Sequence, residues 1–337
     1  MSVWLEVTPL DTLFFRGNEP MEAGQLGPVS LFPPPVSVIQ GAIRTAVLVE
    51  RGVSFADYRQ EKSVSHEILD LIGVCGGQAP FAITAILLQK GGRYYAPAPA
   101  SWFIDEPEKP LSGEGFRGKQ VIVAGAMPAS AGRLSLVASS DSLPLVVTRH
   151  HAVSLAGAWV AVELFASGSV TFADGDIYSG SELYAVERRT GIKLDGLRKV
   201  EQGHLYSASH IRLHDDVTLL IGVDRDPGLA HTGILQLGGE QRRARYEQVT
   251  APATVRDTGA SARYVALAPV EASPENLSSV VTAYQPVMSA GWDLLKGFHK
   301  PTTTWYPAGS VFSEKIAPSC LPLTQNVRGH VVCSQYR

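Results

Sequence analysis

At the start of the chain, aliphatic residues occupy every second position. Val3, Leu5 and Val7 fall on one side of this pattern, which predicts a half-buried strand. After a loop rich in glycine and proline, apolar residues recur every three or four positions over residues 36–47, which predicts a helix with one buried face. We expect Ser37 to cap the start of this helix. Strand, loop and helix in this order are typical of the opening of a ferredoxin-like or another α/β sandwich unit.

Two residues of the predicted helix bear on function. Gly41 lies in the helix interior, where glycine costs about 1 kcal/mol relative to alanine. We therefore expect another backbone or a ligand to approach the helix closely at this point. Arg44 follows one turn later. It either binds a phosphate through two N–H groups or extends along the helix edge into solvent, and the helix alone favours the second alternative.

Apolar runs predict further strands along the chain. Residues 81–89 and 217–223 have the pattern of buried strands, and residues 203–213 alternate well enough to form another. The pair Gly91–Gly92 predicts a hairpin turn that leads into a return strand at residues 93–99.

Composition and turn signals predict an insertion and a domain boundary. Residues from about 100 to 175 are rich in glycine, proline, serine and charge, so we interpret them as an insertion. Within it, residues 145–172 contain either a helix at 154–163 or a strand in their second half. The Asp-Pro-Gly sequence at residues 226–228 marks a break. We therefore predict two domains, 1–226 with the insertion and 227–337. In the second we expect a strand at residues 261–267 and a helix at residues 274–283 capped by Ser273.

Glycines and arginines stand together after an apolar run at residues 234–237. Gly238 and Gly239 are followed by arginines at positions 242, 243 and 245. Glycines let the backbone come close to a ligand, so the segment suits a loop that cradles phosphate; a hairpin with a solvated basic strand fits as well. Upstream, a second pair of arginines at positions 188 and 189 precedes a predicted turn at residues 190–191.

A glycine- and proline-rich segment at residues 292–311 interleaves basic and aromatic side chains. Lys300 and Trp305 are two of them. Single-stranded RNA is bound by such combinations, because aromatic rings stack on bases and cations contact the backbone. Core aromatics beside a solvated lysine are the more common explanation of this pattern.

Composition limits the partners. The 337 residues are 45% hydrophobic and carry a net charge of −3, so a nucleic acid would have to bind a local patch or an assembly. The three cysteines are not spaced for zinc, which favours a reducing compartment, and no cofactor is expected. We find no signal peptide and no run near the roughly 18 apolar residues that span a bilayer, so a soluble, cytoplasmic protein without a membrane partner is expected.

Five motifs stand in the order found in one known family. They are LDTLFFRG, FPPPVSVIQGAIRT, ERRTGIKLD with GHLYSASHIRL, LQLGGEQRRARYE, and GWDLLKG with HKPTTTWYPAGSVF. Over about residues 3–312 the chain resembles the third subunit of the type III-B CRISPR effector, the Cmr complex, which belongs to the RAMP superfamily of RNA-binding proteins. The resemblance implies an α+β fold of two ferredoxin-like (RRM-like) domains with long insertions and glycine-rich loops.

The same resemblance implies a function. The family's subunit is non-catalytic, holds the repeat-derived 5′ tag of the guide RNA (crRNA), and contacts the large polymerase-like subunit and the first backbone RAMP subunits. By their places in the motifs, the following residues are expected to contact RNA or to shape the RNA-facing cleft: Arg16, Arg44, Arg188, Arg189, Gly238, Gly239, Arg242, Arg243, Lys300, Trp305 and Gly309. Residues 313–337 depart from the family pattern, with no clear strand, which leaves open whether the sheet of the second domain is complete.

An enzyme is the alternative. Some RAMP relatives are metal-independent endoribonucleases that process guide-RNA precursors with a histidine or tyrosine as general acid or base. In this chain His150, His151, His299 and Tyr306 are the candidates for that chemistry. His210 and His214 lie on a predicted strand, where they are roughly 13 Å apart, too far to share a metal ion. We rank the non-catalytic RNA-binding subunit first, the nuclease second and a pure protein scaffold third.

Overall fold

The structure is a computed structural model of the chain. It describes residues 2–17, 30–62, 64–105, 113–126, 145–146, 151–194, 200–255, 261–289, 292–293 and 296–324. The chain forms two compact units, each assembled from three segments. The first unit comprises residues 1–91, 183–251 and 288–304, and the second comprises 92–182, 252–287 and 305–337. The sequence division into domains 1–226 and 227–337 stays a prediction. No helix in the described ranges is long and apolar enough to cross a membrane.

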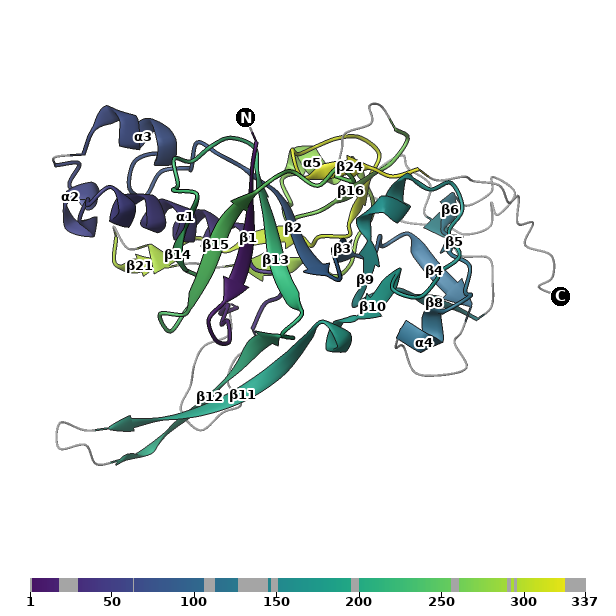
Figure 1. Cartoon of the computed structure of the whole chain (residues 1–337), viewed down its shortest axis with the longest axis horizontal. Coiled ribbons are helices and arrows are strands. Elements are labelled where there is room, and N and C mark those ends of the chain that lie inside the picture. The colour runs from purple at the N-terminus through teal and green to yellow at the C-terminus, as the bar shows by residue number, and fades with distance from the viewer. Residues whose placement is uncertain are drawn as a thin grey trace. The chain divides into compact units, whose positions relative to one another are not determined.

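The fold is mixed α/β, with mostly antiparallel sheets and few helices (Figure 1). In the first unit the N-terminal strand β1 (Val3–Pro9) pairs antiparallel on one side with β13 (Val217–Val223) and on the other with β15 (Arg243–Val249). Strand β2 (Ile83–Lys90) follows β13, and β14 (Thr232–Gln236) follows β15. The strands predicted from apolar runs are thus confirmed as the centre of this sheet.

Helix α1 (Val36–Glu50) contacts strands β2 and β14 of this sheet, as Figure 1 shows. Its buried residues recur at the helical spacing that the sequence predicts, and the hydroxyl group of Tyr246 on β15 donates a hydrogen bond to the carboxylate of Glu50. One expectation is wrong. The helix begins at Val36, so Ser37 lies inside it and makes no cap. A Cβ atom on Gly41 would meet nothing within 4 Å among the described residues, so no neighbouring backbone there requires this glycine, and the approach of a ligand stays a prediction.

Two short helices complete the helical part of the first unit. They are α2 (Phe55–Arg59) and α3 (His66–Ile72), and the side chains of Ser54 and Ser65 cap their N-termini.

Strands β11 (Tyr184–Leu194) and β12 (Val200–Leu213) form an antiparallel ribbon that extends away from the sheet (Figure 1). Leu13, just after β1, exchanges two backbone hydrogen bonds of 2.8 Å with Ile211 of β12, which fastens the ribbon to the start of the chain. The turn predicted at residues 190–191 is wrong, because both residues continue β11 and pair with β12.

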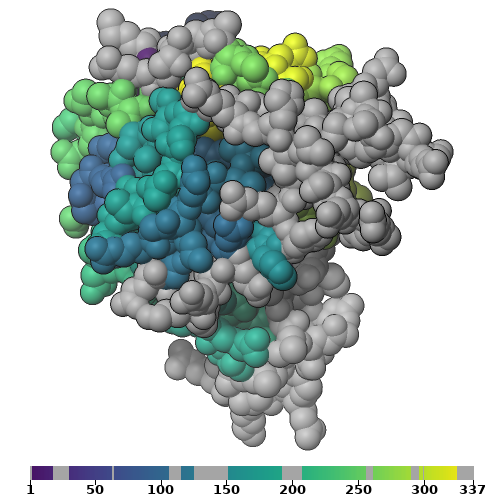
Figure 2. All heavy atoms as spheres, turned by 90° about the vertical axis from the view of Figure 1, so that its right-hand side faces the viewer, coloured from purple at the N-terminus to yellow at the C-terminus, as the bar shows by residue number. Residues whose placement is uncertain are grey.

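The strands of the second unit also pair antiparallel. Strand β9 (Ala158–Ala161) pairs with β3 (Arg93–Pro97) and with β10 (Ile177–Ser179), and blue and teal atoms of this part of the chain are packed against each other in Figure 2. Strand β16 (Tyr264–Ala266) lies between β23 (Val311–Phe312) and β24 (Cys320–Pro322).

The remaining elements are short. The first group consists of β4 (Trp102–Asp105), α4 (Gly113–Phe116), β5 (Ile122–Val123), β6 (Gly125–Ala126), β7 (Leu145–Val146), β8 (Ala152–Ser154) and the 3-10 helices Val162–Ala166 and Gly180–Glu182. The second group consists of β17 (Val270–Glu271), α5 (Pro274–Leu277), β18 (Val280–Thr282), β19 (Val287–Ser289), β20 (Trp292–Asp293), β21 (Phe298–His299) and β22 (Thr303–Tyr306).

Three expectations for the second unit are changed by these elements. Ser273 caps α5 as predicted, but the helix ends at Leu277 and a strand replaces its expected second half. Residues 154–163, where a helix is one of the two alternatives, contain a strand followed by the start of a 3-10 helix. Residues 313–337 hold strand β24, although the sequence shows no clear strand there; residues 325–337 lie outside the described part.

Candidate nucleic-acid interface

Three arginines of the first unit converge on the carboxylate of Asp11. Arg189 donates to both of its oxygens, at 3.0 and 3.1 Å, while Arg212 donates at 3.1 Å and Arg242 at 2.7 Å. The hydrogen bonds from Arg189 are the main cause that lowers the pKa of Asp11 to about 2, so the carboxylate is ionised at neutral pH. We call these four residues the Asp11 junction.

Two further carboxylates balance the charge of the Asp11 junction. Glu187 accepts hydrogen bonds from Arg212 at 2.6 Å and from Arg189 at 2.8 Å, which lowers the pKa of Glu187. Glu240 accepts one from Arg242 at 3.1 Å. Together the junction and these two acids contain as many carboxylates as guanidinium groups. The junction therefore ties β11, β12 and the loop before β15 to the segment after β1 without a net positive charge.

A buried histidine lies beneath this network. His210 is 0% exposed, its ring stacks on Phe14, and its Nδ1 is 3.0 Å from the hydroxyl oxygen of Thr12. Burial lowers the pKa of His210 below its ordinary value, so the ring is neutral at pH 7. Because Thr12 is also buried, neither side chain presents a reactive atom to RNA.

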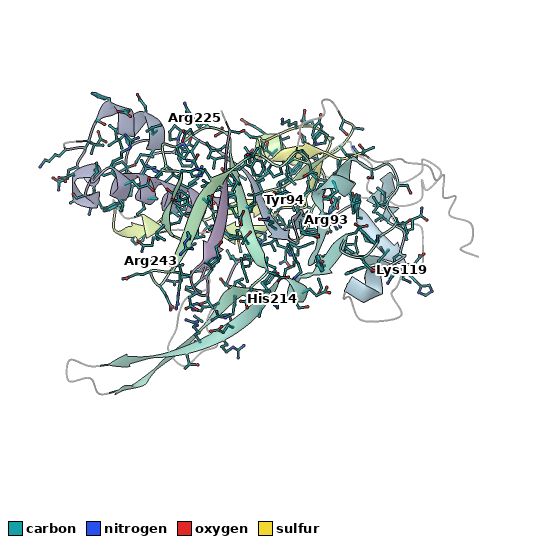
Figure 3. All side chains as sticks on the ribbon, in the orientation of Figure 1. Arg93, Tyr94, Lys119, His214, Arg225 and Arg243 are labelled. Carbon is teal, nitrogen blue, oxygen red and sulfur yellow. The ribbon has the colours of Figure 1, made fainter. Side chains whose placement is uncertain are left out.

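Other arginines of the first unit point into solvent. The side chains of Arg16, Arg188 and Arg243 are exposed and form no hydrogen bond or ion pair with the residues that the structure describes. Arg188 alternates with Arg189 on β11, so it lies on the opposite side of the ribbon from the Asp11 junction. Figure 3 shows Arg243 where β15 begins.

Strand alternation explains the exposure of Arg243 and adds Arg245, which is not among the residues expected to contact RNA. Arg243 and Arg245 share the outer side of β15, whereas Ala244 and Tyr246 are 0% exposed on the inner side. Arg245 is also exposed and without a partner among the described residues. The period of two along residues 243–246 is the signal that could have found it. The segment forms a hairpin whose second strand is basic, and phosphate binding by it stays a prediction.

Arg44 has partners within the chain. Its guanidinium donates to the carbonyl oxygens of Val74 and Gly77 and to the hydroxyl group of Tyr58, and it lies over the Tyr58 ring at 5.8 Å from the centroid. These contacts fasten α1 to α2 and to the turn after α3. They give Arg44 a structural role; contact with RNA stays a prediction.

The candidate glycines approach other parts of their own unit. Gly238 has φ +91°, and a Cβ atom there would clash with the carbonyl oxygen of Phe14, to which the N–H of Gly239 donates a bond of 2.8 Å. In the second unit, Gly309 has φ +89°, and a Cβ atom there would clash with the carbonyl oxygen of Ala98. Contacts with neighbouring backbone therefore account for these glycines without a ligand.

The remaining candidates lie outside the Asp11 junction. Lys300 is exposed, and Trp305 on β22 is half-buried. Tyr306 is only 7% exposed and packs edge-on against Phe312 in a hydrophobic cluster, where it has no access to a substrate.

Of the histidines proposed for the nuclease alternative, two fall on described residues. His151 is exposed just before β8, and His299 ends β21, while His150 lies outside the described residues. In the part of the chain with described coordinates, no group of three or more His, Cys, Asp or Glu side chains could hold a metal ion.

The comparisons with known proteins first define a class of fold. The chain is similar to a subunit in the structure entitled "Cryo-EM structure of the Type III-B Cmr-beta bound to cognate target RNA", with a TM-score of 0.54 and 18% identity, covering 93% of this chain and 87% of that one. A second structure of that complex, bound to cognate target RNA and AMPPnP, gives a TM-score of 0.51 and 17% identity, with 92% and 85% covered. These likenesses show a shared fold. No curated protein matches the chain.

The family follows from the sequence profile that matches. Residues 5–264 match the family described as "CRISPR-associated protein (Cas_Cmr3)", and the chain belongs to this family. The resemblance found in the sequence motifs is thereby confirmed. Membership supports a role as a structural, RAMP-type subunit of a type III-B CRISPR effector complex.

Proposed function

We propose that this chain is a non-catalytic subunit that holds the repeat-derived 5′ tag of the guide RNA in a type III-B complex. We further propose that it docks the large polymerase-like subunit and the first backbone RAMP subunits in the cytoplasm. Family membership and the fold likeness to subunits of complexes bound to cognate target RNA support this proposal.

One observation carries the proposed role in RNA binding. Two sets of arginines in the first unit differ in their partners. The junction arginines are neutralised by carboxylates, whereas the side chains of Arg16, Arg188, Arg243 and Arg245 are exposed without a partner among the described residues. An unpaired guanidinium can approach a phosphate without first giving up an ion pair. The exposed set would therefore contact the tag, while the Asp11 junction holds the strands that carry it.

The net charge of −3 is consistent with binding as part of an assembly. A chain without an excess of positive charge gains little general attraction for RNA, so neighbouring subunits would complete the groove. We expect the isolated chain to bind guide RNA weakly.

A binding experiment with the assembled complex tests the proposal. Guide RNA with the 5′ tag, and the same RNA with a scrambled tag, are incubated in chelator with the chain and the other subunits of its complex. Retained and total RNA are then compared on one denaturing gel. We expect the tagged RNA to be retained preferentially and intact.

A matched pair of variants makes the experiment specific. The triple variant R16A/R188A/R243A should lose the preference for the tag, whereas R51A, which removes an arginine paired with Glu67 at the end of α1, should keep it. Equal retention of both RNAs by the wild type would refute tag binding. RNA cut at a single position would instead support the nuclease alternative.

A further inference from the structure

Strand β14 is the last strand on its side of the first unit's sheet. Among the described strands it pairs with β15 alone, with Ile234 opposite Arg245 and Gln236 opposite Arg243. At one end of this pair, the backbone N–H of Gln248 donates to the carbonyl oxygen of His231. At the other end, the backbone N–H of Leu237 donates to the carbonyl oxygen of Arg242. Hydrogen-bonded positions alternate along an antiparallel pair, so Gly233 and Leu235 also bond to β15.

Every second residue of β14 directs its backbone N–H and C=O groups to the open edge of the sheet. The backbone N–H and C=O groups of Thr232, Ile234 and Gln236 point to the open side of the strand, because their neighbours use the side next to β15. Within the described ranges, none of these groups has a hydrogen-bond partner. The same three side chains are exposed, and Ile234 is 47% exposed.

This edge lacks the features that usually prevent strand addition. Natural edge strands carry lysine or another charge, proline, or a bulge. The sequence of β14, TGILQ, has neither charge nor proline, and its register with β15 is regular. An apolar residue occupies its centre.

We propose that the open edge of β14 is a docking site for an extended segment of another protein subunit of the complex, which adds to the sheet as a further strand. Only another extended backbone presents donors and acceptors at the spacing that all three residues require. A residue of the added strand beside Ile234 would be apolar. The identity of the partner as a complex subunit rests on the proposed function.

RNA fits this edge less well than a peptide. The strand has no positive charge to attract phosphate, and the exposed arginines of β15 point outward from the face of the sheet, not sideways from its edge. The side chains of Ile234 and Arg245 are neighbours on one face of the sheet, whereas the open backbone groups of β14 lie along its edge. The edge can be tested separately, because a substitution at Ile234 leaves every arginine in place.

Hydrogen–deuterium exchange resolved to single amides tests the proposal. The chain is compared alone and in the complex purified through a tag on a different subunit. We expect the N–H groups of Thr232, Ile234 and Gln236 to exchange rapidly in the isolated chain and slowly in the complex. The N–H groups of Gly233 and Leu235 should be protected in both, and this alternation is specific to strand addition.

A pair of variants gives an independent readout. Ile234→Pro removes one outward N–H group that β15 does not use, whereas Ile234→Thr keeps that group and removes the apolar side chain. In titrations of the chain into a complex that lacks it, we expect Ile234→Pro to bind roughly tenfold more weakly than Ile234→Thr, since it loses a hydrogen bond and obstructs its neighbours. Equal melting temperatures of the two isolated variants would show that β14 itself is intact.

The other outcomes contradict the inference in distinguishable ways. If the chain assembles into the complex but all three amides still exchange rapidly, strand addition at β14 is refuted and the subunit role is left intact. Protection in the isolated chain that grows with concentration would identify a second copy as the occupant. Protection by guide RNA alone would identify RNA. A chain that does not assemble at all would refute the proposed function together with this inference.

Discussion

Replacing Asp11 with asparagine removes the one carboxylate that joins all three arginines of the Asp11 junction. The neutral amide keeps the size of the side chain but loses the charge that attracts Arg189, Arg212 and Arg242. We expect a less stable first unit and a ribbon that is held less firmly to the segment after β1.

The pKa of Asp11 bounds the size of this effect. Its lowering from 3.8 to about 2 corresponds to at most about 2.4 kcal/mol, at roughly 1.36 kcal/mol per pH unit. The side chain is 43% exposed, so solvent screening reduces the expected loss to about 1 kcal/mol.

Urea unfolding at pH 7 measures this loss. Asp215→Asn is the matched control, because Asp215 is exposed in the turn between β12 and β13 and has no partner among the described residues. Asp11→Asn should unfold at a lower urea concentration than the control with an unchanged slope, and the difference should shrink in 1 M salt.

The pH dependence gives the sign of the effect. A carboxylate whose pKa is lowered on folding contributes its full stability above its ordinary pKa of 3.8 and loses it as the pH falls toward 2. The wild type should therefore lose its advantage over Asp11→Asn between about pH 4 and pH 2. An unfolding midpoint of Asp11→Asn equal to that of Asp215→Asn at pH 7 would refute this account of the junction.

Three further outcomes are expected. Arg44→Ala should lower the free energy of unfolding by about 2 kcal/mol in urea, because charged hydrogen bonds to two carbonyl oxygens are lost; an unchanged free energy would contradict its structural role. A reduced salt slope of RNA binding by the complex would add contact with RNA to that role. Gly238→Ala should cost more stability in urea unfolding than Gly52→Ala, since both have positive φ but only the first meets a neighbouring backbone, and equal costs would show that this clash is relieved. Arg243→Ala should reduce the slope of the logarithm of the guide-RNA binding constant against the logarithm of the salt concentration by about 0.7, whereas Arg242→Ala should leave this slope nearly unchanged. The opposite result would place Arg242 on the RNA and not Arg243.

Much of the first sheet could be predicted because its strands carry their own signals. The alternation at Val3, Leu5 and Val7 and the apolar run at residues 217–223 each follow directly from burial on a sheet. The turn expected at residues 190–191 failed because Thr-Gly is a weak turn signal, and cross-strand pairing with β12 holds both residues extended.

The site could be predicted only in part. The sequence indicates which arginines gather near glycines and turns, but it does not show which carboxylate each one meets. Asp11 and Arg242 are 231 positions apart in the chain and form an ion pair of 2.7 Å. That pairing depends on the tertiary fold, so Arg188 and Arg189 are neighbours in sequence yet belong to different sets.

Photo-crosslinking of the tag tests the central claim most directly. The complex is assembled on guide RNA with 4-thiouridine placed either in the 5′ tag or near the 3′ end, irradiated, and digested, and the peptides attached to RNA are identified by mass spectrometry. Our account predicts that tag positions attach to peptides of this chain containing Arg16, Arg188 or Arg243, and that 3′ positions do not. Crosslinks from the tag found only in other subunits would contradict it.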